Sequence, residues 1–336
     1  LADGAPNAPF DITNPGGTFI FAFGGLTLII LMSAISALLW HLRVIPLIVN
    51  ALSVLFKKPL GVGGPIGLGA TANVFLGQVE APLLIKPYLS SMTRHELLII
   101  MTVGMSTIAG SVMVVYTTML FPIYGSGLIG HFLSASLISV PAAIMYANMM
   151  IPSNEKTDFP DEKSDDMYSS IMDAITQGTK NGLDIFLNVI AMLIVVMALV
   201  FLVNSILGLL PNLNGNPITL ELMLGYLFAP LAWFMGIPWN ESIMAGQLLG
   251  VKTALNEFVA YLYLSDTETY QLGDKSRMIM LYALCGFANF SSVGILLSGL
   301  SAMVPERRAD LISVSGKALW CALLASCLTG FIIGIL

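Results

Sequence analysis

The chain has 336 residues, of which 56% are hydrophobic and only 10% are charged, and its mean hydropathy is +0.85. A soluble domain carries about 25% charged residues, so the composition excludes a protein whose whole surface faces water. The basic residues form no patch with aromatic residues, so we expect no nucleic acid among the partners.

Apolar runs recur along the chain at a length that suits a membrane. A helix needs about 20 apolar residues to cross the hydrocarbon core of a bilayer, and the sequence holds several runs of this kind. We therefore predict an all-α polytopic membrane protein with the lipid bilayer as its main solvent.

Cysteines and histidines give no sign of a metal site or a disulfide framework. The chain has three of each, and they are scattered without metal-ligand spacing. The sequence also lacks a nucleophile elbow and a phosphate loop. We therefore predict no catalytic residue and no cofactor.

The first half of the chain is predicted to hold five membrane elements after an N-terminal loop. Residues 1–17 lack the basic start of a signal peptide, and we expect the chain to be an N-terminally truncated piece of a longer protein. Interruptions by GVGGPIGLG and GQVEAP favour a re-entrant helical hairpin, hairpin one, over a continuous span. The first repeat (18–150) is predicted as a span at 18–40, an interfacial helix at 41–59, hairpin one at 60–92, and spans at 96–122 and 127–150.

The second half is predicted to hold the same kinds of element in the same order. It follows an acidic loop at 151–166 and an amphipathic stretch at 167–182, which together form a connecting region (151–182). Proline, glycine and polar residues again interrupt an apolar stretch, which indicates a second hairpin. The second repeat (183–336) is predicted as a span at 183–210, an interfacial helix at 218–236, hairpin two at 238–264, and spans at 276–303 and 316–336.

This order predicts two inverted repeats. A re-entrant hairpin returns to its own side of the membrane, so each half crosses three times and the halves have opposite orientations. Inverted repeats with paired interrupted segments are typical of secondary transporters, whose site lies where the breaks meet.

The basic residues predict the orientation in the membrane. This topology places eleven of the fourteen basic residues on one side and only Lys275 and Arg277 on the other, with Lys252 inside hairpin two. The positive-inside rule makes the larger set cytoplasmic. We therefore expect the acidic loop 151–166 in the cytoplasm and the C-terminus on the outer face of a bacterial inner membrane.

Four polar clusters interrupt the apolar segments at corresponding places in the two halves. Intramembrane ionisable residues usually face a water-filled cavity and mark a site or pathway. Lys252 precedes Glu257 by five residues, which leaves a structural ion pair open there. The clusters are Asn73, Gln78 and Glu80; MSTIAGS at 105–111; Asn256 and Glu257; and GFANFSS at 286–292.

The chemistry of the clusters indicates a neutral polar solute and a cation. Carboxylates, amides and hydroxyls can hydrogen-bond such a solute, and Phe287 and Phe290 offer aromatic faces for a ring. No lysine or arginine is present in the clusters to receive an anion. Asn73, with the hydroxyl of Ser106 or Thr107 and backbone carbonyls, could form an oxygen cage for Na⁺.

Each of these features also has a structural interpretation. Asn73 could simply hydrogen-bond a neighbouring helix, as such amides do in membrane bundles. The serine and threonine hydroxyls could bond to their own helical turn, and the two phenylalanines could serve packing alone.

At these residues the sequence resembles the concentrative nucleoside transporters. GQVE, STIAGS, LNEFVAY and FANFSSVG carry the resemblance, which extends over essentially the whole chain. It implies a fold of eight core transmembrane helices and two hairpins, of which this chain starts just before the third helix. It also implies a homotrimer and nucleoside symport driven by a sodium gradient, in which a transport half moves as an elevator against a scaffold half.

The resemblance also implies roles for individual residues. Gln78 and Glu80 would meet the nucleobase, with Val112 and Leu193 as apolar contacts. Glu257, Asn289 and Ser292 would hold the ribose hydroxyls, and Phe287 would line the ribose side. The implied sodium site consists of Asn73, the Leu76 carbonyl, Ser106, Thr107 and Ile108.

One position departs from the family pattern, and three rival functions remain open. Val79 stands where many members have Thr or Ser, which leaves the preferred base open. A proton-coupled nucleoside symporter is the nearest rival, with Glu80 carrying the proton. An intramembrane enzyme could use Glu80 and Glu257 as an acid–base pair, and a passive channel is the third alternative.

Overall fold

The computed structural model describes residues 27–49, 51–52, 64–153, 167–211 and 217–336. All regular elements in these ranges are helices, so the all-α prediction is confirmed. The acidic loop from 154, the N-terminal loop 1–17 and parts of the first span, the first interfacial helix and hairpin one lie outside the described residues. The helices of the first half are α2 (Leu28–His41), α4 (Gly64–Ala72), α5 (Glu80–Leu83), α6 (Lys86–Leu89), α7 (Arg94–Ser106), α8 (Gly110–Tyr124) and α9 (Leu128–Met150).

The described elements of the second half are also helices. Here α12 and α13 occupy the residues assigned to hairpin two, with a break at Leu255 and Asn256. The helices are α10 (Ile171–Leu207), α11 (Leu220–Phe234), α12 (Trp239–Ala254), α13 (Glu257–Ser265), α14 (Asp274–Ala283), α15 (Phe290–Met303) and α16 (Arg308–Ile335), with a short 3₁₀ turn at Pro305–Arg307.

Two of the predicted spans are broken in the middle. The segment 96–122 forms α7 and α8, separated by residues 107–109, and the segment 276–303 forms α14 and α15, separated by residues 284–289. The two breaks touch. Gly286 has a φ of +150°, and a Cβ at this position would lie 2.8 Å from the carbonyl oxygen of Ser106, at the end of α7. Only glycine tolerates both this backbone angle and this approach.

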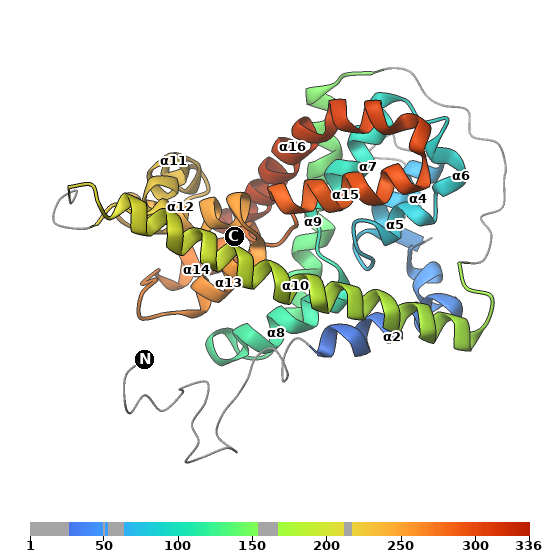
Figure 1. The fold of residues 1–336 in the computed structure, drawn as a ribbon, viewed down its shortest axis with the longest axis horizontal. Helices are drawn as coiled ribbons and strands as arrows, with labels where there is room; N and C mark the ends of the chain where they lie inside the picture. The colour runs from blue at the N-terminus through green and yellow to red at the C-terminus, as the bar shows by residue number, and fades with distance from the viewer. Residues whose placement is uncertain (1–26, 50, 53–63, 154–166, 212–216) are drawn as a thin grey trace, which may run out of the picture.

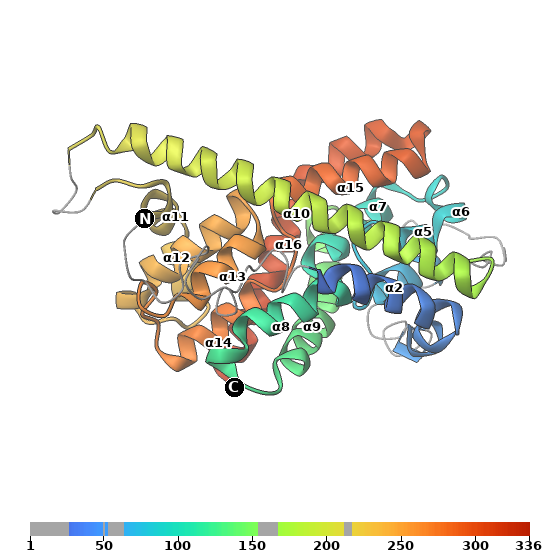
Figure 2. The ribbon, with the colours of Figure 1, turned by 60° about the horizontal axis from the view of Figure 1, so that its bottom comes forward.

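One helix, α10, covers both the predicted amphipathic stretch and the span that follows. Its 37 residues correspond to about 55 Å at 1.5 Å per residue, well beyond the about 30 Å hydrocarbon core. The side chain of Ser170 caps its start by accepting the backbone N–H of Asp173. Figures 1 and 2 show α10 running along most of the length of the molecule.

Close packing joins α10 to α2. A Cβ on Gly178 would lie 2.7 Å from the Ala37 side chain, and one on Gly182 would lie 2.7 Å from the Cα of Ile30. Two glycines four residues apart let helix backbones approach in this way, as small residues do between membrane helices. The helices α2 and α10 together lie along one side of the other helices (Figure 1).

The core lies among α7, α9, α14 and α16. Every residue of α7 from Glu96 to Ser106 is buried, and α16 packs against α7, α9 and α14. Three segments of the described chain are long and apolar enough to cross a bilayer, namely Arg94–Tyr124, Leu128–Met150 and Pro305–Ile335. The helices α11 and α12 together would also qualify but meet at a bend of 117°.

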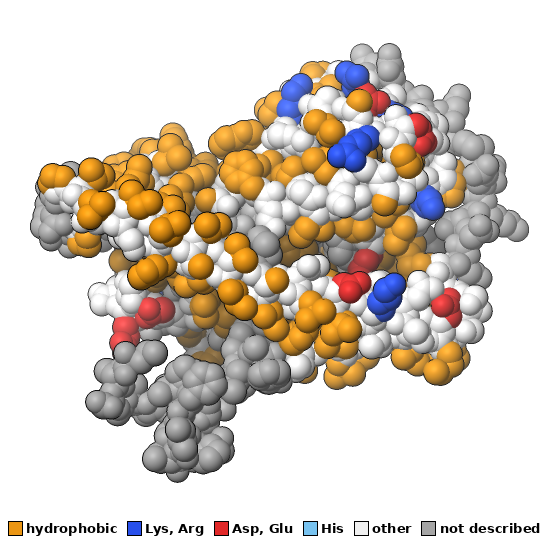
Figure 3. Space-filling view, viewed as in Figure 1, with side chains coloured by type: hydrophobic (Ala, Val, Ile, Leu, Met, Phe, Trp, Pro, Cys, Tyr) orange, Lys and Arg blue, Asp and Glu red, His pale blue; other side chains and the backbone are white. Residues whose placement is uncertain are grey.

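The surface divides into apolar and charged regions. Figure 3 shows hydrophobic side chains along α10 and around α11 and α12, with charged groups gathered towards the ends where α10 and α16 begin. Apolar side chains such as Leu187, Ile194 and Phe201 on α10 are more than half exposed. Such a continuous apolar surface is what lipid contact requires.

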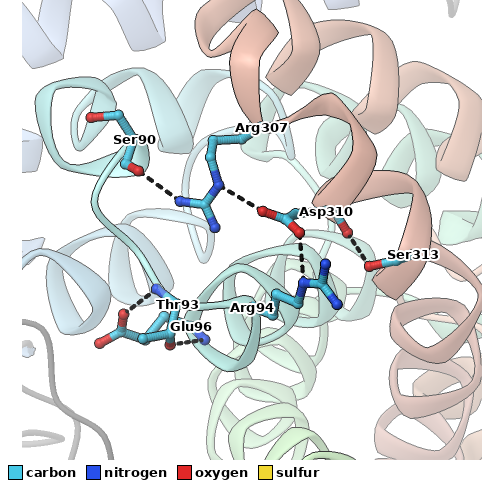
Figure 4. A network of polar contacts seen from close by, with 7 residues as sticks. All are labelled: Ser90, Thr93, Arg94, Glu96, Arg307, Asp310 and Ser313. Atoms are coloured by element: carbon cyan, nitrogen blue, oxygen red, sulfur yellow. Dashed lines mark hydrogen bonds and ion pairs between the residues drawn. The ribbon is translucent and has the colours of Figure 1, made fainter.

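A polar cluster fixes the end of the hairpin-one segment to the start of α16 (Figure 4). The carboxylate of Asp310 accepts from Nε of Arg94 at 2.6 Å and from Nε of Arg307 at 2.8 Å. Arg307 also donates to the backbone carbonyl of Ser90 at 2.6 Å. The adjacent α7 begins with a capping box formed by Thr93 and Glu96.

Candidate functional site

A cavity of about 350 Å³ lies between the hairpins, the broken helices and α10. Ligand pockets for small molecules commonly fall in the range of about 300 to 1,000 Å³. Glu80 and Glu257 both line it, so the fold brings the two intramembrane carboxylates to one chamber. The lining residues expected from the sequence are Gln78, Val79, Glu80, Val112, Glu257, Phe287, Asn289 and Ser292.

Glu257 is held by donors on both oxygens. The hydroxyl of Tyr116 donates to Oε1 at 2.8 Å, and the Nδ2 amide of Asn289 donates to Oε2 at 2.8 Å. Asn289 is itself fixed, because its Oδ1 accepts the backbone N–H of Ser292 at 2.7 Å and so caps α15. One carboxylate at the start of α13 is thus connected to α8 and to the start of α15.

Lys252 bonds to the end of α14 and not to Glu257, the partner that the sequence left open. Its buried ammonium donates to the carbonyl of Ala283, the last residue of α14, at 2.8 Å. It forms no ion pair with Glu257 within the part of the chain that the structure describes. The cation therefore supports the break between α14 and α15, where the last carbonyls of a helix have no partner within the helix.

Glu80 lies at the tip of hairpin one. Its Oε2 accepts the backbone N–H of Gly77 at 3.0 Å, so the carboxylate closes the turn that begins α5. The Oε1 of Gln78 is buried and has no hydrogen-bond partner among the described residues. Val79 packs against α15, because a Cβ on Gly299 would lie 2.6 Å from its Cγ1. The Gln78 oxygen, which lacks a donor and lies two residues from the Glu80 carboxylate, is suited to accept a hydrogen bond from a polar ligand.

Two of the apolar residues expected near the ligand line the cavity, and one does not. Val112 and Phe287 line the cavity. Phe290 does not line it and is 66% exposed, so the idea that it stacks on a ring is wrong. It follows the capping residue Asn289, and the start of α15 turns its side chain away from the cavity. The side chain of Leu193 lies outside the described part of the chain.

The expected sodium-site residues lie where hairpin one meets the break between α7 and α8. The Phe75 carbonyl accepts the backbone N–H of Gly110 at 3.1 Å and joins the two segments. Asn73 donates to the Gly69 carbonyl at 3.1 Å, while its Oδ1 is buried and has no partner within the part of the chain that the structure describes. Buried together in this region, outside the main cavity, are Asn73, Leu76, Ser106, Thr107 and Ile108.

The hydroxyls in this region bond to their own helix. Those of Ser106 and Thr107 both donate to the Val103 carbonyl at 3.1 Å. The unpartnered Asn73 oxygen is the feature that fits a hard cation, which prefers oxygen ligands. No group of three or more His, Cys, Asp or Glu side chains with metal-binding geometry occurs among the described residues.

Sequence reasoning missed several lining residues. Tyr116 stands in an ordinary apolar helix, and nothing local distinguishes it. Asn181 and Asn188 on α10 also line the cavity. Asn188 lies in the apolar run DIFLNVIAML and carries the same signal, a polar side chain in a predicted span, that drew attention to Asn73.

Comparisons with known proteins find relatives of nearly the whole chain. A family model described as the C-terminus of Na⁺-dependent nucleoside transporters matches residues 131–334, and a second, described as nucleoside recognition, matches residues 22–122. The nucleoside permease NupC of Helicobacter pylori is 36% identical over 98% of this chain and 78% of its own length. The sodium/nucleoside cotransporter 1 of Mus musculus is 33% identical over 94% of this chain and 51% of its own length.

Solved structures show the same fold. The structure of CNTnw in an inward-facing substrate-bound state has a TM-score of 0.87 and 34% identity, covering 96% of this chain and 76% of that chain. CNTnw variants in outward-facing states match equally well.

The fold and its polar chamber define an all-α, multi-pass membrane transporter. The matches identify it further: the chain belongs to the concentrative nucleoside transporter family. The family consists of transporters, so the intramembrane-enzyme alternative is excluded.

Proposed function

We propose that this nucleoside transporter is a symporter that imports nucleosides by using a sodium gradient. One observation carries the proposal: Glu257 is fixed between Tyr116 and Asn289 in a cavity that Glu80 also lines. A carboxylate fixed in this way retains lone pairs for the vicinal hydroxyls of a ribose. Gln78 and Glu80 meet the nucleobase, while Phe287 and Ser292 complete the ribose side.

The base contacts include an apolar part. Val112 lines the cavity beside these polar groups, and Leu193 is proposed as a second apolar contact by the family resemblance. Val79 packs on Gly299 and offers no hydroxyl to the base. A site built with polar groups for a particular partner rejects solutes that leave those groups unpaired, so the ribose end is expected to dominate selection.

Sodium binds, in this proposal, between hairpin one and the break after α7. The unpartnered Oδ1 of Asn73 and nearby backbone carbonyls, including that of Leu76, provide oxygen ligands, with Ser106, Thr107 and Ile108 around them. Occupancy orders the tip of hairpin one and so completes the nucleoside pocket. A membrane potential of 100 mV contributes about 2.3 kcal/mol for each charge that enters.

The transport step is proposed as an elevator movement within a homotrimer. The hairpins and broken helices carry the cargo, while α2 and α10 belong to the static part. The proposed location is a bacterial inner membrane, with the loop 151–166 in the cytoplasm and the C-terminus outside.

The test is isotope uptake into proteoliposomes that contain the purified full chain. Uridine and a purine nucleoside are offered with a Na⁺ gradient, and in parallel with choline in place of Na⁺ at fixed pH. We expect accumulation above the outside concentration with Na⁺ only. Uptake that persists in choline and follows a pH gradient would replace sodium by a proton as the coupling ion, and uptake that only equilibrates would indicate a channel.

A further inference from the structure

The cavity has a second polar wall, which the roles assigned above do not use. This wall is the face of α10 formed by Asn181, Ile185, Asn188 and Val189. The two asparagines are seven residues apart, so they lie within about 20° of each other around the helix and about 10 Å apart along it. They therefore form a polar row along one side of the chamber.

The side chains of these two asparagines are available to hydrogen-bond a ligand. The other asparagines of the cavity cap helices: Asn256 accepts the backbone N–H of Val259, and Asn289 accepts that of Ser292. Asn181 and Asn188 make no hydrogen bond to any residue that the structure describes. An amide in an apolar membrane helix is costly unless water or a ligand satisfies it.

Packing of α10 against its neighbour does not account for the asparagines. The contact with α2 is made at Gly178 and Gly182, where the backbones approach closely. Asn181 lies roughly 100° around the helix from Gly182, because successive residues are separated by about that angle. The amides thus face the chamber beside the packing surface.

The two asparagines differ in what else they line. Asn181 also lines a smaller adjoining cavity of about 50 Å³ together with Glu80 and Leu83, so it lies on the hairpin-one side. Asn188, about 10 Å further along α10, does not line this smaller cavity and shares only the main chamber, which Glu257 also lines. The row therefore begins beside Glu80 and continues along the chamber wall away from it.

We propose that Asn181 and Asn188 are substrate-contacting residues, with Asn181 at the nucleobase end and Asn188 at the ribose end. An amide both donates and accepts hydrogen bonds, so it suits the edge of a base and a hydroxyl alike. This inference rests on the proposed transport of nucleosides. It adds that α10 contributes hydrogen-bonding groups as well as the proposed apolar contact of Leu193, so that the nucleoside is held by polar groups from both sides.

The test compares Asn181→Leu and Asn188→Leu with Thr179→Val. The two leucine variants preserve volume and remove the amide. Thr179→Val is the matched control, since Thr179 is exposed on the same helix and its hydroxyl bonds only to the Ile175 carbonyl. Nucleoside affinity is measured by titration calorimetry on the purified full chain with saturating Na⁺, and uptake is measured in proteoliposomes.

We expect each leucine variant to lose about tenfold in uridine affinity, as removal of one hydrogen-bond partner of a bound ligand typically does. Asn188→Leu should lose little towards a nucleoside without ribose hydroxyls, because that ligand lacks the partner group. Asn181→Leu should change the ranking of uridine against adenosine. Asn188→Ser, which replaces the amide by a hydroxyl that still donates and accepts, should recover part of the affinity and also shows that the fold tolerates substitution.

The outcomes separate this inference from the function on which it rests. If the unmodified chain binds and transports nucleosides while both leucine variants bind like Thr179→Val, the inference is overturned and the transport function stands. If the unmodified chain neither binds nor transports nucleosides, the proposed function fails and the inference fails with it.

Discussion

The phenolic oxygen of Tyr116 lies 2.8 Å from Oε1 of Glu257, although the two residues belong to different halves of the chain. Tyr116 also packs against Tyr261, with ring centroids 4.7 Å apart. Its ring position is therefore fixed by packing, and its hydroxyl holds the carboxylate towards the cavity.

Tyr116→Phe should weaken nucleoside binding by about fivefold. The change keeps the ring and removes one donor from Glu257, a net loss of about 1 kcal/mol. Nucleoside affinity measured by calorimetry at saturating Na⁺ checks it. Tyr124→Phe is the matched control on the same helix, because the Tyr124 hydroxyl donates to the Arg277 carbonyl away from the cavity. Equal affinities for the two variants would remove Tyr116 from the positioning of Glu257.

Gly299→Ala should impair uptake by displacing the tip of hairpin one. The new methyl group would lie 2.6 and 2.9 Å from the two methyl carbons of Val79, and such overpacking costs about 1–3 kcal/mol. Initial uptake rates in proteoliposomes provide the measurement.

The same contact offers a rescue. Gly299→Ala combined with Val79→Ala restores the space, so uptake should recover in the double variant. Gly294→Ala serves as the control, since nothing lies within 4 Å of its added Cβ. A double variant as impaired as Gly299→Ala alone would show that the loss does not arise at Val79.

Asn73→Leu should raise the Na⁺ concentration needed for half-maximal uptake. It removes the buried Oδ1 without a partner, the atom proposed to face sodium. The control is Thr71→Val on α4, whose hydroxyl is already satisfied by the Gly67 carbonyl at 2.7 Å. The Na⁺ dependence of nucleoside uptake is measured for both. If Asn73→Leu keeps the original Na⁺ dependence, Asn73 is not a ligand.

Asp310→Asn should have only a small effect on stability. Its carboxylate meets two arginines, but the Arg94 side chain is 65% exposed, and solvent-exposed ion pairs typically contribute about 0–1 kcal/mol. We expect a thermal unfolding midpoint in detergent within a few degrees of the unmodified chain, and normal uptake. A collapse of uptake at unchanged stability would instead connect this cluster to the transport step.

The class of fold could be read from the sequence because lipid imposes it. Few charges and long apolar runs leave only helices that satisfy their own backbone, and the all-α membrane fold is confirmed. The breaks within α7–α8 and α14–α15 were harder to locate. The motif STIAGS contains the first break, but each of its residues is compatible with a continuous helix. The break depends on the contact between Phe75 and Gly110, which is a tertiary feature.

For the site, too, the sequence reveals residues whose own surroundings are unusual and misses those whose role depends on distant contacts. Polar residues in apolar segments carry a local signal, and Gln78, Glu80, Glu257 and Asn289 line one cavity. Tyr116 carries no such signal, because its role depends on Glu257, far away in the chain. The sequence does not reveal the direction of the Phe290 side chain, because that direction depends on where α15 begins, directly after Asn289.

The contact between Gly286 and the Ser106 carbonyl has a thermodynamic consequence. It leaves no room between the end of α7, where sodium is proposed to bind, and the segment that leads to Asn289 and Ser292. A ligand that fixes one segment therefore restricts the other. By reciprocity, if a bound ion raises the affinity for the nucleoside by some factor, a bound nucleoside must raise the affinity for the ion by that same factor.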